Sequence, residues 1–453
     1  MSSDFIAAFE AKTPGSRRLN DRSHQLTPGG ISHDSRFTPP YPLYVSRAQG
    51  SKIWDVDGNR YHDLWMAHYD AILGHAPAVV AEKLKTVMED GLHIGLAMEH
   101  EVKLAQKVVD MMPGAEQVRF CASGTEATMY AVRLARGFTG RDVILKMVGG
   151  WHGANTDLMI DVRPPEYIGP ESAGLPPDLN TYTRSVQFND IEDTARGIAE
   201  AGDNLAGIIM EVAMGSTGFL PAEPEYLAFV REETAKRGAV LIFDEVITGF
   251  RLAPGGAQEV VGVTPDLTTL GKVMGGGMPV GAIAGKAEIM SLSGVTPKRP
   301  KLERVLIGGG TYSCNPLTMV AGLTTLDILH SRQNEIYPAL EQMGAQLAAG
   351  MKDAFQAVGI PVFVNQNGSL VEVHFPKEDG LPLRNMADLV NNTYRDKQGE
   401  YATRLRNHGV FLIHGGALSL EHTQADIEDI IQAHRTVAVE MAAELETETG
   451  AGN

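Results

Sequence analysis

The chain has 453 residues, 43% of them hydrophobic, so it can bury a sizeable core and form two or three structural lobes. Its formal net charge of −17 disfavours nucleic acid and anionic membranes as partners, because phosphate groups select basic surfaces. Cys121 and Cys314 are too few for a disulfide framework or a cysteine metal site. No signal-peptide pattern or membrane-spanning apolar run is present, so we expect a cytoplasmic protein. We also expect no bound metal.

The first part of the chain contains a hairpin signal, because residues 52–64 show two short alternating segments around Asp57 and Gly58. From about residue 76, helical periodicity alternates with short apolar runs. The helical stretches are 80–90, 101–112, 125–137 and 225–237, and the apolar runs are 143–148, 206–212, 239–246 and 280–285. This alternation predicts a mostly parallel sheet covered by helices, an α/β fold.

Long helical stretches return after about residue 325. They cover 336–357, 383–408 and 424–446, and enclose the strand-like segments PVFVNQ, SLVEVHF and VFLIHGG. We expect a smaller α+β lobe that can share its sheet with the N-terminal hairpin. The predicted organisation is therefore an N-terminal contribution to the small domain (1–75), a large domain (76–324) and a C-terminal small domain (325–453).

Asp244 and Glu245 end the apolar strand VLIFDEV, and open α/β sheets bring functional groups to this carboxyl edge. A carboxylate there can pair with a protonated pyridine nitrogen and keep that nitrogen protonated. By itself, Asp244 is explained equally well as a solvated acid at the end of a strand.

Lys272, in DLTTLGKVMGGG, lies between a short predicted strand and a glycine run. A single lysine is most often solvated. Here, desolvation and a nearby cationic cofactor would favour the neutral amine that a Schiff-base lysine needs, and the flanking glycines allow a close approach of a ligand.

Ser123, Gly124 and Thr125 begin a predicted helix, and Ser123 has capping-box spacing to Glu126. The capping box explains the helix start without a ligand, but the same N–H groups and positive dipole end can bind a phosphate. Trp151, in GGWHG, can stack on a planar heterocycle, although an isolated aromatic residue more often packs in a core.

In this order and spacing, these segments resemble the class III (subgroup II) aminotransferases of fold type I, over nearly the whole chain. The resemblance implies pyridoxal 5′-phosphate (PLP) as cofactor, bound to Lys272 as a Schiff base, with Asp244 at its pyridine nitrogen. It further implies that Val246 and Trp151 pack on the two faces of the ring, while Ser123, Gly124 and Thr125 match the phosphate loop.

The resemblance also implies residues beyond this set. Glu211 matches an acid that neighbours the cofactor, although Val212 stands where the family usually has proline. Gly310 and Thr311 match a segment that reaches the phosphate of the other subunit's cofactor. The implied assembly is a homodimer with shared active sites.

Within the family, the sequence is similar to the branch that contains glutamate-1-semialdehyde 2,1-aminomutase and the aminotransferases of β-amino acids and D-phenylglycine. TPGGISHDSRF resembles the branch's P-G-G motif, and Arg36 occupies the place of an arginine that holds the substrate carboxylate. A guanidinium fork suits a carboxylate, whereas outside this motif Arg36 would be interpreted as a solvated loop residue.

Two differences favour an aminotransferase over a mutase. FLIHGGALSLEHT is shorter than the mutase segment and has His414, Gly415 and Gly416 in place of the glutamate-containing S-Q-F-E-A-G-F. His68 and Tyr69 stand where the mutases have a tryptophan–glycine pair.

We therefore predict a PLP-dependent aminotransferase with a ping-pong mechanism through Lys272. The donor would be a β-amino acid or a D-aromatic amino acid, and the acceptor a 2-keto acid. An aminomutase, or a PLP racemase or epimerase, is the alternative enzyme. A catalytically silent relative with the same fold is the alternative outside enzymology, and the retained Lys272 and Asp244 argue against it.

Overall fold

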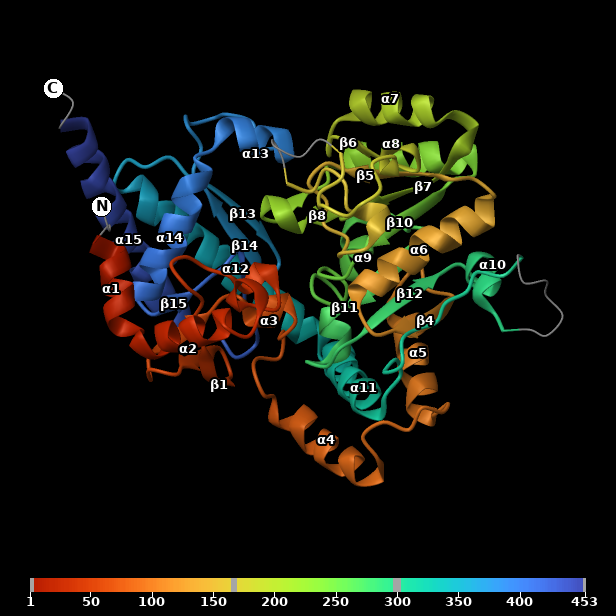
Figure 1. The fold of residues 1–453 in the computed structure, drawn as a ribbon, viewed down its shortest axis with the longest axis horizontal. Coiled ribbons are helices and arrows are strands. Elements are labelled where there is room, and N and C mark those ends of the chain that lie inside the picture. The colour runs from red at the N-terminus through yellow and green to blue at the C-terminus, as the bar shows by residue number, and fades with distance from the viewer. Residues whose placement is uncertain (1–3, 164–168, 296–302, 451–453) are drawn as a thin grey trace. The chain divides into compact units, whose positions relative to one another are not determined.

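The computed structural model describes residues 4–163, 169–295 and 303–450. The chain forms two compact units (Figure 1). Unit 1 contains Met1–Pro77, Pro338–Pro382 and Asn392–Asn453, and unit 2 contains Ala78–Tyr337 and Leu383–Asn391. The expected large domain covers 76–324, whereas unit 2 begins at Ala78, extends to Tyr337 and also includes Leu383–Asn391.

Unit 2 is built around a seven-stranded sheet with the order β4-β12-β11-β10-β7-β5-β6. Its strands are β4 (Gln117–Cys121), β5 (Val143–Met147), β6 (Thr183–Val186), β7 (Leu205–Met210), β10 (Val240–Asp244), β11 (Leu267–Gly271) and β12 (Gly281–Gly285). Neighbouring strands are parallel, except that β12 is antiparallel to both β11 and β4. The predicted, mostly parallel sheet is confirmed.

Helices cover both faces of this sheet (Figure 1). α7 (Ile191–Ala201) and α8 (Pro224–Arg237) share one apolar core with Val143, Leu145 and Met147 of β5. α6 (Gly124–Thr139) shares the core on the opposite face with Ile144. The central strands are apolar on both sides because neither face is open to water.

The remaining helices of unit 2 are α4 (Ala78–Asp90), α5 (Glu99–Met111), α9 (Gly256–Val261), α10 (Ala287–Met290), α11 (Pro316–Ser331) and α13 (Met386–Asn392). The four helical stretches expected in this part of the chain correspond to α4, α5, α6 and α8. The four expected apolar runs correspond to β5, β7, β10 and β12. A short pair, β8 (Ala213–Met214) and β9 (Leu220–Pro221), follows β7.

Unit 1 joins the two ends of the chain in one sheet of order β1-β2-β3-β15. Its strands are β1 (Val45–Gln49), β2 (Lys52–Asp55), β3 (Arg60–Asp63) and β15 (Val410–Phe411). The antiparallel β2–β3 pair is the predicted hairpin, and β15 pairs with β3 in parallel. The expectation that the C-terminal lobe shares a sheet with this hairpin is confirmed.

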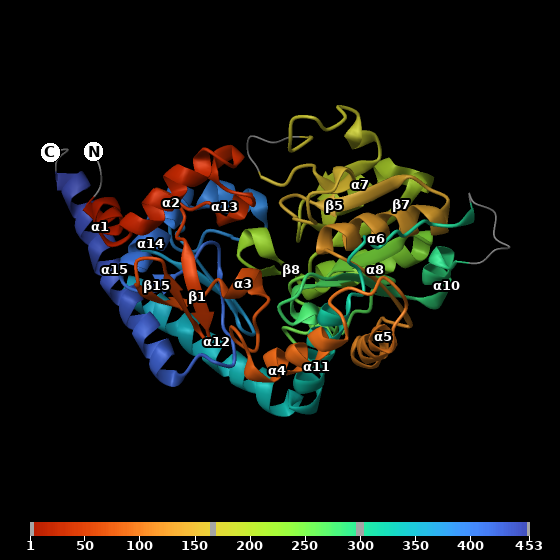
Figure 2. The ribbon, with the colours of Figure 1, turned by 60° about the horizontal axis from the view of Figure 1, so that its bottom comes forward.

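A second sheet in unit 1 contains β13 (Phe363–Asn367), β14 (Leu370–His374) and β16 (Gly416–Ala417). The helices are α1 (Asp4–Lys12), α2 (Pro14–His24), the single turn α3 (Met66–Tyr69), α12 (Gln333–Gln356), which begins in unit 2, α14 (Arg395–Asn407) and α15 (Gln424–Gly450). Figures 1 and 2 show α14 and α15 side by side. None of the helices in the described ranges is long and apolar enough to cross a membrane.

The prediction of one helix over 383–408 is wrong, because the chain forms α13 and α14 with a break at Thr393 and Tyr394. Thr393 forms an isolated β-bridge with Pro376, and the Tyr394 N–H donates to the Phe375 carbonyl at 2.8 Å. These backbone groups therefore pair with the segment after β14 instead of continuing a helix.

Candidate active site

The predicted site residues of unit 2 follow neighbouring strands of the large sheet. Ser123–Thr125 follow β4, Trp151 follows β5, Glu211 follows β7, Asp244–Val246 lie at the end of β10 and Lys272 follows β11. These five strands run in the same direction, so their carboxyl ends meet at one edge. The sheet topology thus brings together residues that are far apart in the sequence.

Asp244 is almost fully buried, at 5% exposure, and both of its carboxylate oxygens are hydrogen-bonded. Oδ1 accepts from the Val246 N–H at 3.1 Å and from the Thr269 hydroxyl at 2.9 Å. The ring of His152 donates from Nδ1 to Oδ2 at 2.7 Å. A buried carboxylate held by three donors is positioned to face a cationic ligand.

The sequence reasoning missed His152, which adjoins Trp151 in the same loop. Its side chain is fully buried, and its carbonyl accepts from the Thr128 hydroxyl at 2.6 Å. Its Nε2 atom has no hydrogen-bond partner among the described residues. A histidine in the loop that follows β5, a strand of the same sheet as β10, was the available signal.

Glu211 forms a second buried acid beside this pair. Its carboxylate accepts from the Trp151 N–H at 3.1 Å and from the Gly215 N–H at 2.9 Å. Burial raises the pKa of Glu211, and His152 and the two N–H groups oppose this increase, whereas the Asp244 carboxylate adds to it. Glu211 therefore fixes the backbone that carries Trp151.

The start of α6 has the predicted capping arrangement. The Ser123 hydroxyl accepts from the Glu126 N–H at 3.2 Å, while the Glu126 carboxylate accepts from the Ala122 N–H at 2.8 Å. In the usual capping box, the Glu126 carboxylate would accept from the N–H of the N-cap residue Ser123. Here it accepts from the N–H of the residue before it, Ala122. The first turn of α6 therefore presents N–H groups at the same edge as Asp244.

Glycine is required where this turn meets its neighbours. A Cβ at Gly124 would lie 2.9 Å from Val246 Cγ1, and one at Gly153 would lie 2.3 Å from Thr125 Oγ1. The α6 turn is therefore packed against Val246 on one side and against the loop after β5 on the other. The two close approaches leave a compact cradle of backbone atoms that side chains would fill.

Lys272 has a left-handed backbone conformation, with φ of +47°. A non-glycine residue in this region costs about 1 kcal/mol or more, and such strain is concentrated at functional sites. Lys272 is half-buried and opens a short 3-10 turn, Lys272–Gly275. A Cβ at the preceding Gly271 would lie 3.2 Å from Val246 Cγ1, so the end of β11 adjoins Val246.

Three other predicted residues are exposed. Trp151 retains 46% exposure, so it does not belong to a core. Gly310 lies beside the α6 turn of its own chain, because a Cβ there would be 3.1 Å from Glu126 Oε1. Thr311 follows it on the surface. Their contact with a second subunit stays a prediction.

Arg36 belongs to unit 1, where it ends the 3-10 turn Asp34–Arg36 with an exposed side chain. The ring of His33, the residue before this turn, lies 5.0 Å from that of His68. Arg36 therefore lies in the same segment as His33, whose ring is close to that of His68. His68 is one of the positions where the sequence differs from the mutases. Its contact with a substrate stays a prediction.

The segment with His68 and Tyr69 is itself unusual. Four successive residues, Met66 to Tyr69, have φ between +40° and +69°, which forms a left-handed turn. The rings of His68 and Tyr69 lie 4.5 and 4.9 Å from that of Trp65, and the Tyr69 hydroxyl donates to the His414 carbonyl. The two sequence differences therefore adjoin each other within unit 1.

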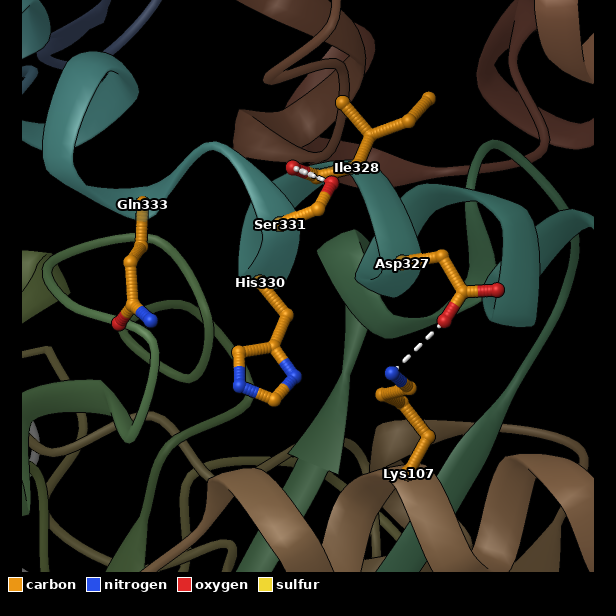
Figure 3. Close-up of a pocket in the computed structure, with 6 residues that line it drawn as sticks. All are labelled: Lys107, Asp327, Ile328, His330, Ser331 and Gln333. Atoms are coloured by element: carbon orange, nitrogen blue, oxygen red, sulfur yellow. Dashed lines mark hydrogen bonds and ion pairs between the residues drawn. The ribbon is translucent and has the colours of Figure 1, made fainter.

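A pocket of about 420 Å³ lies elsewhere in unit 2, between α5 and α11. Figure 3 shows its lining, Lys107, Asp327, Ile328, His330, Ser331 and Gln333. Lys107 forms an ion pair with Asp327 at 2.7 Å, and none of the predicted site residues lines this pocket.

The fold is that of a fold-type I PLP-dependent enzyme. Residues 34–425 match the family model described as Aminotransferase class-III. The chain therefore belongs to the class III aminotransferase family and is a PLP-dependent enzyme.

Similar proteins include both kinds of enzyme considered above. The chain is 41% identical to glutamate-1-semialdehyde 2,1-aminomutase of Methanobrevibacter smithii, over 94% of this chain and 98% of that protein. Among solved structures, an omega-transaminase from Sphaerobacter thermophilus has a TM-score of 0.87 at 34% identity, covering 95% of this chain and 98% of its own. A beta-phenylalanine aminotransferase from Variovorax paradoxus has a TM-score of 0.85 at 30% identity, with 97% of each chain covered.

The described residues suit PLP by their chemistry. A buried, hydrogen-bonded carboxylate suits a protonated ring nitrogen, and the glycine-lined cradle at the α6 turn suits a phosphate. Lys272, directly after the neighbouring strand β11, suits the covalent attachment of an aldehyde.

Proposed function

We propose that this protein is an aminotransferase that moves an amino group from a β-amino acid or a D-aromatic amino acid to a 2-keto acid. The observation that carries the choice over a mutase is the segment between β15 and β16. It contains no acidic residue from Leu412 to Gly416, and its His414 carbonyl is bonded to Tyr69. The next acidic residue, Glu421, packs against Gly50 and Gly74 instead.

In this proposal, each residue at the strand edge has a defined task. Asp244 would hold the pyridine nitrogen and stabilise its positive charge, and His152 orients Asp244 through the 2.7 Å hydrogen bond. Val246 and Trp151 flank the ring. The first turn of α6, with Ser123, Gly124 and Thr125, holds the phosphate, as the cradle described above supports.

PLP, when bound, supplies an electron sink for the carbon that carries the amino group. Lys272 would move the proton: its amine would take a proton from that carbon of the donor, hold it on Nζ and return it to complete the transfer. Arg36 binds the substrate carboxylate through its guanidinium fork. Because an aminotransferase would not return the amino group to the same molecule, a 2-keto acid would have to accept it in a second half-reaction.

We also propose a homodimer in which Gly310 and Thr311 reach the partner's cofactor. Exposed apolar side chains near this segment support it: Leu92, Leu96 and Tyr312 have exposures of 59%, 74% and 67%. The rings of Tyr312 and His93 lie 5.1 Å apart, so the two loops that carry these side chains adjoin each other. Apolar surface of this kind is typical of a subunit contact. The proposal includes a cytoplasmic location, which the two free cysteines support.

An aminomutase is the second candidate, and the 41% identity to the M. smithii aminomutase over 94% of this chain favours it. A test without keto acid separates the two. Purified enzyme is incubated with a panel of β-amino acids, D-aromatic amino acids and glutamate 1-semialdehyde, and the visible absorbance of the cofactor and the product are followed. An aminotransferase stops after one amino group per active site and resumes when 2-oxoglutarate or pyruvate is added. Sustained conversion of glutamate 1-semialdehyde without a keto acid would instead establish the mutase.

A further inference from the structure

Lys146 is a buried cation that the proposed mechanism does not use. It lies within β5, where it is paired with Ser185 of β6 and Ile209 of β7, and its exposure is 0%. Lysine is almost never fully buried without a partner, because the loss of hydration of the ammonium is costly. Its Nζ donates to the Ile160 carbonyl at 2.6 Å.

Three carboxylates act electrostatically on this ammonium. Burial lowers the pKa of Lys146 to about 8, and Asp161, Glu211 and Glu171 oppose this decrease, so the amine remains largely protonated at neutral pH. The three acids come from different positions. Glu211 follows β7, whereas Asp161 and Glu171 belong to the long connection between β5 and β6.

The acids in that connection are already bonded locally. Asp161 Oδ1 accepts from the Gly169 N–H at 2.6 Å, and Glu171 accepts from the N–H of Val162 at 3.1 Å. Lys146 thus ties this connection to β5. Its ammonium donates to the Ile160 carbonyl and not to a carboxylate of the connection.

A short path of hydrogen bonds leads from Lys146 to the candidate site. The residue after Ile160 is Asp161, whose carbonyl accepts from the Gly149 N–H at 2.8 Å. Gly149 begins the segment that contains Trp151, held by Glu211, and His152, bonded to Asp244. Ile160 and Asp161 therefore form the outer support of the loop that presents both residues.

We propose that Lys146 is a positioning residue: its ammonium holds Ile160 and Asp161 against β5, and thereby fixes Gly149 to His152 at the strand edge. The importance of this for the reaction rests on the proposed roles of Trp151 and His152. Lys146 itself touches neither substrate nor cofactor in this proposal.

The test compares two variants within β5. Lys146→Met keeps the aliphatic stem but removes the charge and the donor, whereas Val143→Ala removes apolar contacts at the other end of the strand. Both should lower the midpoint of thermal unfolding. In the apo-protein, hydrogen exchange measured by mass spectrometry should be at least about 10-fold faster over 149–163 in Lys146→Met only, as expected for the loss of one charged hydrogen bond.

A second measurement uses the protein loaded with PLP. Lys146→Met should change the visible circular dichroism of the cofactor, which reports its asymmetric surroundings, and Val143→Ala should not. Equal exchange and equal dichroism in the two variants, at similar thermal stability, would overturn the proposal. The exchange measurement needs neither substrate nor cofactor, so failure of the proposed reaction in the substrate panel leaves its result standing.

Lys146→Gln, which keeps a hydrogen-bond donor without the charge, is measured in the same way if Lys146→Met does not fold. Increased exchange over 149–163 in this variant supports the proposal. Failure of both Lys146 variants to fold, while Val143→Ala folds, would overturn it, because Lys146 would then support the whole of unit 2 and not one loop.

Discussion

A buried histidine network in unit 1 and one in unit 2 differ in whether both ring nitrogens of the histidine are hydrogen-bonded. In unit 1, Gln398 donates to Glu372, Tyr401 donates to His434 Nε2 at 2.6 Å, and His434 Nδ1 donates to the Ile430 carbonyl at 2.7 Å. Both nitrogens of this histidine are therefore used within the core.

The network in unit 2 lies on loops at strand ends. His152 uses Nδ1 for Asp244, but its Nε2 has no partner in the described part of the chain. A network that is complete within a core serves the fold, whereas one that lies at a sheet edge is available to a ligand. Mutations in the unit 2 network should thus affect turnover, and those in the unit 1 network should affect stability.

The largest effect is expected for Lys272→Ala. Removal of the proton-transfer amine should lower turnover by about 10²–10⁴-fold or more, while PLP still binds without a covalent bond. Turnover is measured with the best donor, and covalent binding by reduction with borohydride. Lys85→Ala, at an exposed position of α4, is the matched control. A Lys272→Ala variant that keeps wild-type turnover would refute the central assignment.

Asp244→Asn should have the next largest effect. The amide has nearly the same shape, but it cannot stabilise a protonated ring nitrogen by charge, so we expect turnover to fall by about 10²-fold or more. The pH dependence of the cofactor absorbance should change as well. Thr269→Val, which removes one donor to Asp244 and keeps its charge, is the comparison, and an equal loss in both variants would argue against a role for the charge.

Arg36→Ala should have a moderate effect that depends on the substrate. Loss of a charged hydrogen bond should raise KM for carboxylate-bearing donors by about 10-fold or more, with a smaller change for an amine that lacks a carboxylate. Steady-state kinetics with both kinds of donor measure this difference. Arg17→Ala, another exposed arginine of unit 1, serves as the control. Unchanged kinetics with the carboxylate donor would mean that Arg36 is a solvated residue that does not bind the substrate carboxylate.

Glu372→Gln should change turnover least and the pH dependence of stability most. Burial raises the pKa of Glu372 to about 8, so the folded protein retains a proton that the unfolded chain releases near pH 4.3. This group therefore lowers the free energy of unfolding as the pH rises from about 4 to about 8. Denaturant titrations across this range should show a weaker decrease in Glu372→Gln, with the exposed Glu82→Gln as control. An unchanged pH profile would mean that Glu372 does not titrate in this way.

Several elements of unit 2 could be predicted because apolar periodicity reports burial on both faces of its sheet: α4, α5, α6, α8, β5, β7, β10 and β12. The break between α13 and α14 could not, because it depends on the pairing of Thr393 and Tyr394 with a segment distant in the sequence. Likewise, the strand-end position of Asp244 and the glycines around Lys272 are local signals. The bond between His152 and Asp244, and the burial of Lys146 within an apolar strand, become visible only when the strands are assembled.

The parallel pairing of β15 with β3 has a consequence for synthesis of the chain. In the sheet of unit 1, Val410 and Phe411 pair with His62 and Asp63. This sheet can therefore be completed only after most of the protein has left the ribosome. The sheet of unit 2 lies entirely within Ala78–Tyr337 and can assemble earlier. The strand edge with Asp244 and Lys272 can therefore form in a nascent chain before unit 1, which contains Arg36, is complete.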